Sequence, residues 1–485
     1  MQLIFFSGKG WESWAVEHRP VIPERMPVLV DDDLRFDDGT TPRATVVVSR
    51  WLRELPGSGA PSPSTWAAYA RILRDWMVFL AGHGIGVFDT RERLKAGLSA
   101  YAVNRAAGPP PARFAETTWN QHVSVLSCFY QWAVAEGHAS AVPFSYAQAI
   151  VSYADNARTV QVNLARRRAP RPHVTIKYLE KEFAELFVKG LRGLTPDGLE
   201  DRSFRGRDLV RNAAVGGLAL ATGLRLQEFT YLLVWEIPAL PSRPTSMPIP
   251  FSVPSGIAKG RKFRLTWISY EALAEVHRYI ELERAATAEA ATWLPPSPWG
   301  DPFAVTEPDE RGGRISGVRT RWDSLVPAER RRLVAPGGGS CMLALRNAGG
   351  PFTAWSTVFE RTANRIRQRW EPRFPHVHPH RLRHSFSIQT LECLVSGYYR
   401  QAAKLVADTG ADAALALYLS KADPLMVLRD LLGHSSVTTT EAYLRRLDMT
   451  RIYRDAYQRA GAAEDLFNDD SEREAAEEFD GEDDL

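Results

Sequence analysis

The sequence predicts a mainly α-helical protein with a small β-sheet, divided into two domains. Segments 64–80 and 117–135 place apolar residues three and four positions apart, a spacing typical of helices that bury one face. A basic, proline-interrupted stretch over 163–172 indicates an extended linker between the domains. Beyond it, residues 251–269 hold two runs of strand-forming residues around a glycine-containing turn, as in a β-hairpin.

Composition is that of a soluble globular protein. The 485 residues allow two or three hydrophobic cores, and 45% of them are hydrophobic and 24% charged. Three scattered cysteines predict neither a disulfide framework nor a CxxC metal site. No apolar run is long enough to cross a bilayer, and the first residues lack the features of a signal peptide. We therefore expect a cytoplasmic protein with no membrane partner.

The net charge of +3 conceals an uneven distribution. Residues 464–485 contain twelve acidic residues and one arginine, so this tail carries −11 and the rest of the chain +14. The cations are 51 arginines and 9 lysines, and the planar donor fork of arginine fits phosphate. A basic body with an acidic tail indicates a protein that binds a polyanion, and a soluble protein with a solvating tail is the alternative.

Composition shifts along the chain predict five segments. These are an irregular N-terminal arm over 1–59, a helical domain over 60–160, a basic linker over 161–173, a larger domain over 174–463 and the acidic tail over 464–485. Within the larger domain, residues 285–350 are rich in Pro, Gly and Arg, which predicts a long and partly disordered surface insertion. A second insertion is expected over 397–422. The aromatic stripe of the helical domain is interpreted as core.

Arg225 stands at a predicted junction between two helices. An apolar helix over 209–220 ends at Gly223, and a new helix begins near Arg225. An arginine at a helix start can direct its donors at an anion beside unpaired backbone N–H groups. Glu228, one turn further on, could orient the guanidinium. The alternative is an ordinary surface Arg–Glu pair.

Lys259 and Lys262 lie in the turn of the predicted hairpin. They are two of only nine lysines, and Gly260 between them lets the turn approach a ligand closely. A lysine on such a turn can deliver a proton to a leaving oxygen. The alternative is a solvated basic turn.

Histidines and arginines are crowded over 376–384. His380 and Arg383 are three residues apart and share a face if a helix starts after Pro379. A metal site is the rival interpretation, because four histidines lie close in sequence: His376, His378, His380 and His384. No cysteine or second group of ligands accompanies them, so we expect no metal here.

The last motif is LLGHSSVTTTEAY, which ends at Tyr443. An apolar stripe ends at Gly433, His434 follows it, and a helix that begins near Thr438 carries the tyrosine. Taken alone, the segment could be a helix-turn-helix in which His434 is a turn residue and Tyr443 belongs to the core.

Together, and in this order, ATGLRLQE, the hairpin KG, HRLRH and LLGHSSVTTTEAY resemble the tyrosine site-specific recombinase family of phage integrases and Xer-like proteins. The three residues from His380 to Arg383 and the nine from His434 to Tyr443 match its pattern. The resemblance covers about residues 60–460. It implies a helical core-binding (SAM-like) domain followed by an α+β catalytic domain, forming a C-shaped clamp on DNA.

The resemblance also implies a role for each residue that contacts the phosphate. Tyr443 would attack the scissile phosphate, form a 3′-phosphotyrosyl link and free a 5′-hydroxyl. Arg225 and Arg383 would hold the non-bridging oxygens as charge develops in the transition state. His434 would add a hydrogen bond there.

The same resemblance assigns the two proton transfers to two further residues. Lys259 would protonate the leaving 5′-oxygen, and His380 would take the proton of the tyrosine. Lys262 is a secondary candidate for the acid, and Glu228, Gly433 and His384 are supporting residues. No cofactor, metal ion or ATP is expected, because arginine and lysine supply the positive charge and the phosphotyrosine conserves the bond energy.

The sequence departs from the compact family pattern in two gaps. Lys259 lies 121 residues before His380, and Arg383 lies 51 residues before His434. Both gaps are attributed to the two expected insertions. They leave the residue assignments in place but obscure DNA-site recognition and subunit contacts.

The partners implied are double-stranded DNA recombination sites, with a homotetramer on two paired sites, in a cytoplasmic, nucleoid-associated protein of a mobile element. Accessory DNA-bending proteins or a partner recombinase are further candidate partners. The reaction would be integration and excision, or resolution. Two alternatives stay open, a DNA-relaxing enzyme like the type IB topoisomerases and a catalytically silent DNA-binding relative.

Overall fold

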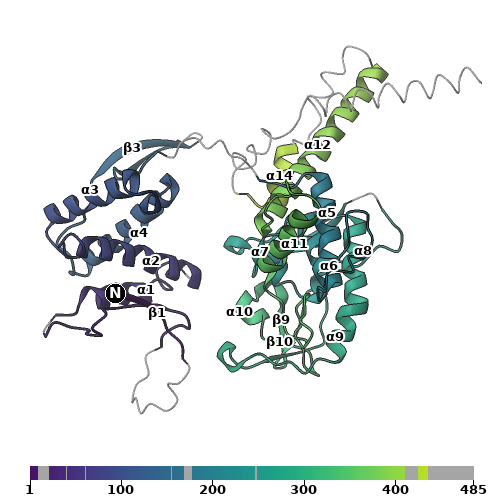
Figure 1. Ribbon diagram of the computed structural model, residues 1–485, viewed down its shortest axis with the longest axis horizontal. Helices are drawn as coiled ribbons and strands as arrows, with labels where there is room; N and C mark the ends of the chain where they lie inside the picture. Colours follow the sequence, from purple (N-terminus) through teal and green to yellow (C-terminus); the bar gives the residue numbers. More distant parts are fainter. Residues whose placement is uncertain are drawn as a thin grey trace, which may run out of the picture. The chain divides into compact units, whose positions relative to one another are not determined.

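The computed structural model describes residues 1–8, 21–39, 41–60, 62–153, 156–168, 177–245, 248–409 and 424–434. The chain divides into two compact units, Met1–His173 and Val174–Leu485, and each is described by itself (Figure 1). Both are mainly helical with small sheets, as the sequence predicts. Tyr443, the acidic tail and the end of the second expected insertion lie outside the described residues. Within the described part of the chain, no helix is long and apolar enough to span a membrane.

The first unit is a group of helices around one aromatic-rich core. Its elements are β1 (Gln2–Phe5), β2 (Pro27–Val30), α1 (Ala44–Glu54), α2 (Pro63–Ala81), α3 (Arg91–Ala107), the 3₁₀ turn η1 (Pro110–Ala112), α4 (Glu116–Ala135), β3 (Tyr146–Tyr153) and β4 (Asn156–Asn163). Helices α2 and α4 are the two predicted amphipathic helices. Trp76 and Trp119, from their predicted apolar faces, are both buried, which confirms the interpretation of that stripe as core.

The structure corrects the expectation of an irregular arm over residues 1–59. Strands β1 and β2 pair antiparallel, and α1 contributes Val48, Trp51 and Leu52 to the core of the unit. The helical spacing of these apolar residues lies next to a stretch rich in Pro, Gly and Asp, which hides it in the sequence.

The end of the helical domain and the start of the linker also differ from expectation. Residues 146–153 and 156–163 form the antiparallel strands β3 and β4 instead of helix. The chain that follows returns to α4: the indole N–H of Trp119 donates to the carbonyl of Ala165 at 2.7 Å, and the Arg167 guanidinium lies 4.3 Å from the Trp119 ring centroid. Up to residue 168 the basic stretch is therefore docked on a helix, because arginine can stack on an aromatic ring.

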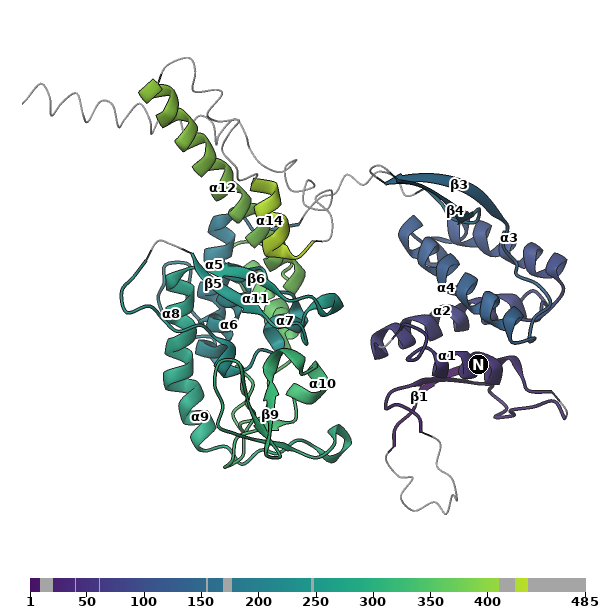
Figure 2. The ribbon, with the colours of Figure 1, turned by 180° about the vertical axis from the view of Figure 1, so that it is seen from behind.

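The second unit is built around α6, which packs against α5, α8 and α12. Its first elements are α5 (Lys181–Leu191), α6 (Leu209–Thr222), α7 (Leu226–Thr230), η2 (Val234–Glu236), β5 (Ile249–Val253), η3 (Lys259–Arg261), β6 (Arg264–Ile268), α8 (Tyr270–Tyr279), the π-turn η4 (Ile280–Arg284) and α9 (Ala285–Glu289). Strands β5 and β6 form the predicted hairpin. The unit continues after the insertion with α11 (Trp355–Arg369), α12 (Pro379–Thr409) and α14 (Pro424–Leu432). Figure 2 shows the hairpin beside α6, against which β6 packs.

Residues 297–350, here named the inserted module, are folded, which corrects the partly disordered insertion expected over 285–350. The module comprises η5 (Ser297–Trp299), β7 (Phe303–Thr306), β8 (Gly312–Ile315), β9 (Val318–Arg321), η6 (Trp322–Ser324), α10 (Pro327–Arg330) and β10 (Leu333–Val334), with strand order β10-β7-β8-β9. Val305, Trp322 and Leu333 form a small core with Leu233 of the main unit. Apolar residues spaced among many Pro, Gly and Arg thus suffice for a core when a second surface completes it.

Candidate active site

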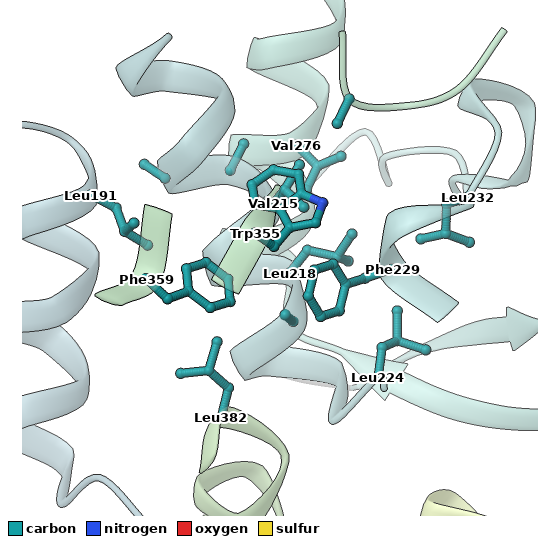
Figure 3. Close-up of a cluster of buried hydrophobic side chains, with 14 of the residues drawn as sticks. Leu191, Val215, Leu218, Leu224, Phe229, Leu232, Val276, Trp355, Phe359 and Leu382 are labelled. Atoms are coloured by element: carbon teal, nitrogen blue, oxygen red, sulfur yellow. The ribbon is translucent and has the colours of Figure 1, made fainter. Parts of the chain in front are cut away.

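Arg225 lies at the junction of α6 and α7. Gly223, which ends α6, has φ +63°, a left-handed conformation that favours glycine. A Cβ at this position would lie 2.3 Å from the ring of Phe386 in α12. Leu224 is buried in the main core, and Arg225 takes the N-cap position of α7 (Figure 3). The core therefore fixes the junction, while 24% of the Arg225 side chain stays exposed.

Glu228 joins Arg225 to a second arginine. Its fully buried carboxylate accepts hydrogen bonds from the backbone N–H of Arg225 (2.7 Å) and from Arg225 Nη1 (3.0 Å). Arg264, buried at the start of β6, donates from Nη1 and Nη2 to the two carboxylate oxygens at 2.7 and 2.6 Å. Burial alone would raise the pKa of Glu228, but the hydrogen bonds and charges of Arg264 and Arg225 lower it to about 2. Glu228 is therefore ionised at neutral pH and orients both guanidinium groups.

The end of α14 is held by a glycine cap. Gly433 has φ +62°, and the N–H groups of Gly433 and His434 bond back to the last turn of the helix, the pattern of a Schellman cap. A Cβ on Gly433 would lie 2.7 Å from Cδ of Arg264. The glycine thus ends the helix, lets Arg264 approach, and fixes where His434 leaves α14.

Arg383 and Arg264 both donate to carbonyls at this helix end. Arg383 is 2% exposed; its Nη1 donates to the carbonyl of Gly223 at 2.6 Å and its Nη2 to that of Leu432. Arg264 Nε donates to the carbonyl of Leu431 at 3.2 Å. Because the C-terminal carbonyls of a helix carry partial negative charge, they attract these cations. Arg383 thereby ties α12 to the α6–α7 junction and to α14.

Three histidines surround these arginines. The rings of His380 and His384 are in edge-to-face contact, 4.3 Å between centroids. Burial, with the added charges of Arg383 and other cations, lowers the pKa of His434 to about 4. Burial first, and then neighbouring charges that include Arg383 and Lys259, also lower the pKa of His380. The imidazoles of His380 and His434 are therefore neutral at pH 7, the form that accepts a proton and donates a neutral hydrogen bond.

Lys259 lies at the turn of the hairpin, in the short η3. Ile257 and Ala258 before it are buried, and the side-chain amide of Gln227 donates to the carbonyl of Ile257 at 3.0 Å. Lys259 itself is exposed, as is Lys262 at the other side of the turn. The buried, hydrogen-bonded residues Ile257 and Ala258 thus support the exposed Lys259, whose charge acts on His380.

The structure groups these predicted site residues at the end of α14: Arg225, Glu228, Arg383, Gly433 and His434. His380 and His384 contact each other, and the charges of Arg383 and Lys259 act on His380. Lys262 is exposed at the other side of the hairpin turn. The nucleophile candidate Tyr443 lies outside the described residues. In the part of the chain described, no group of three His, Cys, Asp or Glu side chains is arranged to hold a metal ion.

Arg264 is a site residue that the motifs do not predict. Its signal in the sequence is strand alternation: Arg264, Thr266 and Ile268 share the buried face of β6. A buried arginine needs an anionic partner, which here is Glu228.

Comparisons with known proteins bear on the first unit. Residues 48–137 match the family described as phage integrase, N-terminal SAM-like domain. This range begins within α1 and covers α2 to α4, so the SAM-like domain expected from the sequence is confirmed.

Solved structures and curated proteins add less. A crystal structure of XerA recombinase is 16% identical, with 85% of this chain and 97% of that chain covered and a TM-score of 0.31. A structure of XerH recombinase bound to difH substrate before cleavage is 13% identical, with 84% of this chain and 83% of that chain covered and a TM-score of 0.42. A structure of XerH bound to palindromic difH after cleavage is 14% identical, with 85% of this chain and 84% of that chain covered and a TM-score of 0.43. These TM-scores are below 0.5, so the likeness that the comparisons establish is that of residues 48–137 to the SAM-like domain. No curated protein matches.

Proposed function

We propose that this chain is a site-specific DNA recombinase of the tyrosine recombinase family, which cleaves and rejoins strands through a covalent bond to Tyr443. The match of residues 48–137 to the phage integrase SAM-like domain supports this proposal. The observation that carries the proposal is the convergence of Arg225, Arg383 and His434 at the end of α14. This cluster of cations and a neutral imidazole is suited to a phosphodiester, and the tyrosine follows His434 by nine residues.

The first step forms a bond between the Tyr443 oxygen and phosphorus and breaks the bond from phosphorus to the 5′-oxygen. Arg225, whose side chain is 24% exposed, donates to a non-bridging oxygen. The charge of Arg383 stabilises the pentacovalent transition state beside it. Neutral His434 donates one more hydrogen bond.

Two proton transfers accompany the step. Neutral His380 takes the tyrosine proton, which its lowered pKa permits because the ring is unprotonated at pH 7. Lys259 gives a proton to the leaving 5′-oxygen. Rejoining reverses both transfers and restores the phosphodiester from the phosphotyrosine, so ATP is not needed. The arginines and Lys259 supply the positive charge that a metal ion would otherwise provide. His384 packs on His380 and orients its ring.

DNA binding would use both units as a clamp, with a homotetramer on two paired sites. The support is the net +14 of residues 1–463 and the exposed arginines at the end of the first unit, Arg166 and Arg168. Such binding weakens steeply with added salt, because each phosphate contact releases counterions.

Covalent capture tests the proposal. A nicked duplex that carries the target site releases a short fragment after cleavage, so the 3′-phosphotyrosyl product accumulates and is seen as a protein–DNA band in a denaturing gel. We expect capture by the natural chain and none by Tyr443→Phe, with DNA affinity changed less than about threefold. Capture by Tyr443→Phe would overturn the nucleophile. Relaxation of any supercoiled DNA without a preferred sequence would favour a topoisomerase, and binding without capture would favour a silent relative.

A further inference from the structure

The inserted module contacts two segments that neighbour basic residues of the proposed site, because Arg225 is the N-cap of α7 and Lys259 begins η3. One is the segment after α7, residues 231–236; the other is the loop before Lys259, residues 254–258. These contacts come from residues 322–330 of the module, which join the two segments by hydrogen bonds and ring stacking.

Arg330 holds the first segment. It is fully buried, and its Nη1 and Nη2 donate to the carboxylate of Glu236 at 2.6 and 2.8 Å. Nη1 also donates to the carbonyl of Tyr231 at 3.0 Å. The rings of Trp235 and Trp322 stack beside this pair, 5.2 Å apart at 13°. A buried bidentate pair of this kind is rigid, because both partners are fixed by several bonds.

The same arginine shapes the surface that meets the second segment. Its Nε donates to the carbonyl of Leu325 at 3.0 Å and its Nη2 to that of Trp322. Between these two residues, the carbonyl of Asp323 accepts from the backbone N–H of Gly256 (2.8 Å) and from Ser255 Oγ (2.9 Å).

Gly256 allows this approach. A Cβ there would lie 2.2 Å from the carbonyl oxygen of Leu325 and 2.9 Å from that of Asp323, and both are backbone atoms that cannot rotate away. The backbone of Gly256 has no positive φ, so contact with the module is what requires the glycine. The N–H of Ala258 returns to the carbonyl of Pro254 at 3.1 Å, which makes the loop a rigid turn.

We propose that the inserted module positions Lys259 for proton transfer, with Gly256 and Ser255 as positioning residues. The proposal rests on the function proposed above, in which Lys259 protonates the 5′-oxygen. A turn fixed at Asp323 leads within three residues from Gly256 to Lys259, so a displaced turn carries the ammonium group away from the leaving oxygen. Misplacement of a reacting group by about 1 Å can slow a reaction about 100-fold.

A substrate with sulfur in place of the bridging 5′-oxygen isolates this role. Cleavage then breaks the P–S bond and releases a thiolate, which is stable without a proton, so the step needs no general acid. A variant that only misplaces the acid is slow on the oxygen substrate and normal on the sulfur substrate. A variant with a damaged fold or phosphate clamp is slow on both.

The experiment measures single-turnover cleavage of both substrates by the full chain and three variants. We expect Gly256→Ala to be slowed about 10- to 100-fold on the oxygen substrate and to match the natural chain on the sulfur substrate. Lys259→Ala should show the same pattern with a larger loss. Gly337→Ala is the matched control, because this module glycine has open space around it and no positive φ; it should cleave both substrates normally.

Ser255→Ala keeps the proposal testable if Gly256→Ala does not fold, since it removes one hydrogen bond to Asp323 and adds no atoms. About a fivefold loss is expected on the oxygen substrate alone. Equal losses on both substrates, or no loss on either, would overturn the positioning role if shown by Ser255→Ala, or by a Gly256→Ala variant that unfolds in urea at the same midpoint as the natural chain. If Lys259→Ala were equally slow on both substrates, the acid in the proposed function would fail instead.

Discussion

Replacing Glu228 by glutamine tests whether a buried carboxylate holds the candidate site together. The substitution keeps the shape of the side chain and removes its charge, so Arg264 loses the ionised partner of its bidentate pair. Breaking a buried ion pair on one side costs about 3–5 kcal/mol of unfolding free energy.

The pKa of Glu228 gives an independent magnitude. Folding lowers it from 4.5 to about 2, and each pKa unit corresponds to about 1.4 kcal/mol. The ionised carboxylate therefore contributes about 3 kcal/mol at pH 7. Since the pKa is depressed in the folded state, this stability is complete above pH 4.5 and is lost as the pH falls toward 2. At pH 3 more than half of it should be gone.

Urea unfolding, followed by circular dichroism and tryptophan fluorescence, measures the difference between Glu228→Gln and the natural chain. We expect about 3 kcal/mol at pH 7 and about 2 kcal/mol less at pH 3. Glu310→Gln is the control, because the Glu310 side chain is 78% exposed; it should change stability by less than about 0.5 kcal/mol. A loss below about 1 kcal/mol at pH 7, or one that does not depend on pH, would refute the reasoning.

Two further predictions concern the end of α14. Gly433→Ala places a Cβ on a residue with φ +62° and 2.7 Å from Cδ of Arg264, so the free energy of unfolding should fall by about 1–3 kcal/mol and cleavage should slow. Urea titration measures the first effect and covalent capture the second. Unchanged values in both measurements would contradict the role of Gly433 as a helix cap. Because its pKa is about 4, His434 should stay neutral down to pH 5. NMR titration of the histidine ring resonances, with that of His434 assigned by its loss in His434→Gln, measures this pKa. Protonation of the His434 ring near pH 6.5 would contradict the prediction.

Local patterns predicted the helices and the hairpin well. Helix α2 and helix α4 lie within a residue or two of the predicted segments, because their apolar spacing is complete; Gly82 also marks the end of α2. The β5–β6 hairpin follows from its strand-forming runs and its turn. Helix α1 was missed because residues with loop propensity surround a short apolar repeat. The inserted module was missed because its core is completed by Leu233, far away in sequence.

The candidate site likewise contains residues that local sequence patterns predict and residues that they do not. Motif residues could be named because each stands beside a signal for a helix end: Gly223 before Arg225, Pro379 before His380, Gly433 before His434. The partners that orient them could not, since Arg264 meets Glu228 and Asp323 meets Gly256 only after the hairpin and the module are in place. Long-range hydrogen bonds leave no periodic trace in a sequence.

The long gaps between motifs are tolerated because the core, and not the separation in sequence, sets the positions of the site residues. Leu224, Ala258 and Leu382 are immediate neighbours of Arg225, Lys259 and Arg383, and all three belong to one buried cluster. Figure 3 shows Leu224 and Leu382 in this cluster. Leu432, two residues before His434, packs with Phe386 of α12 in a second cluster. Each functional side chain is thus one or two residues from an anchored apolar one. Inserted segments can lengthen the loops between anchors without moving them, and the inserted module uses that freedom to add a contact of its own at Gly256.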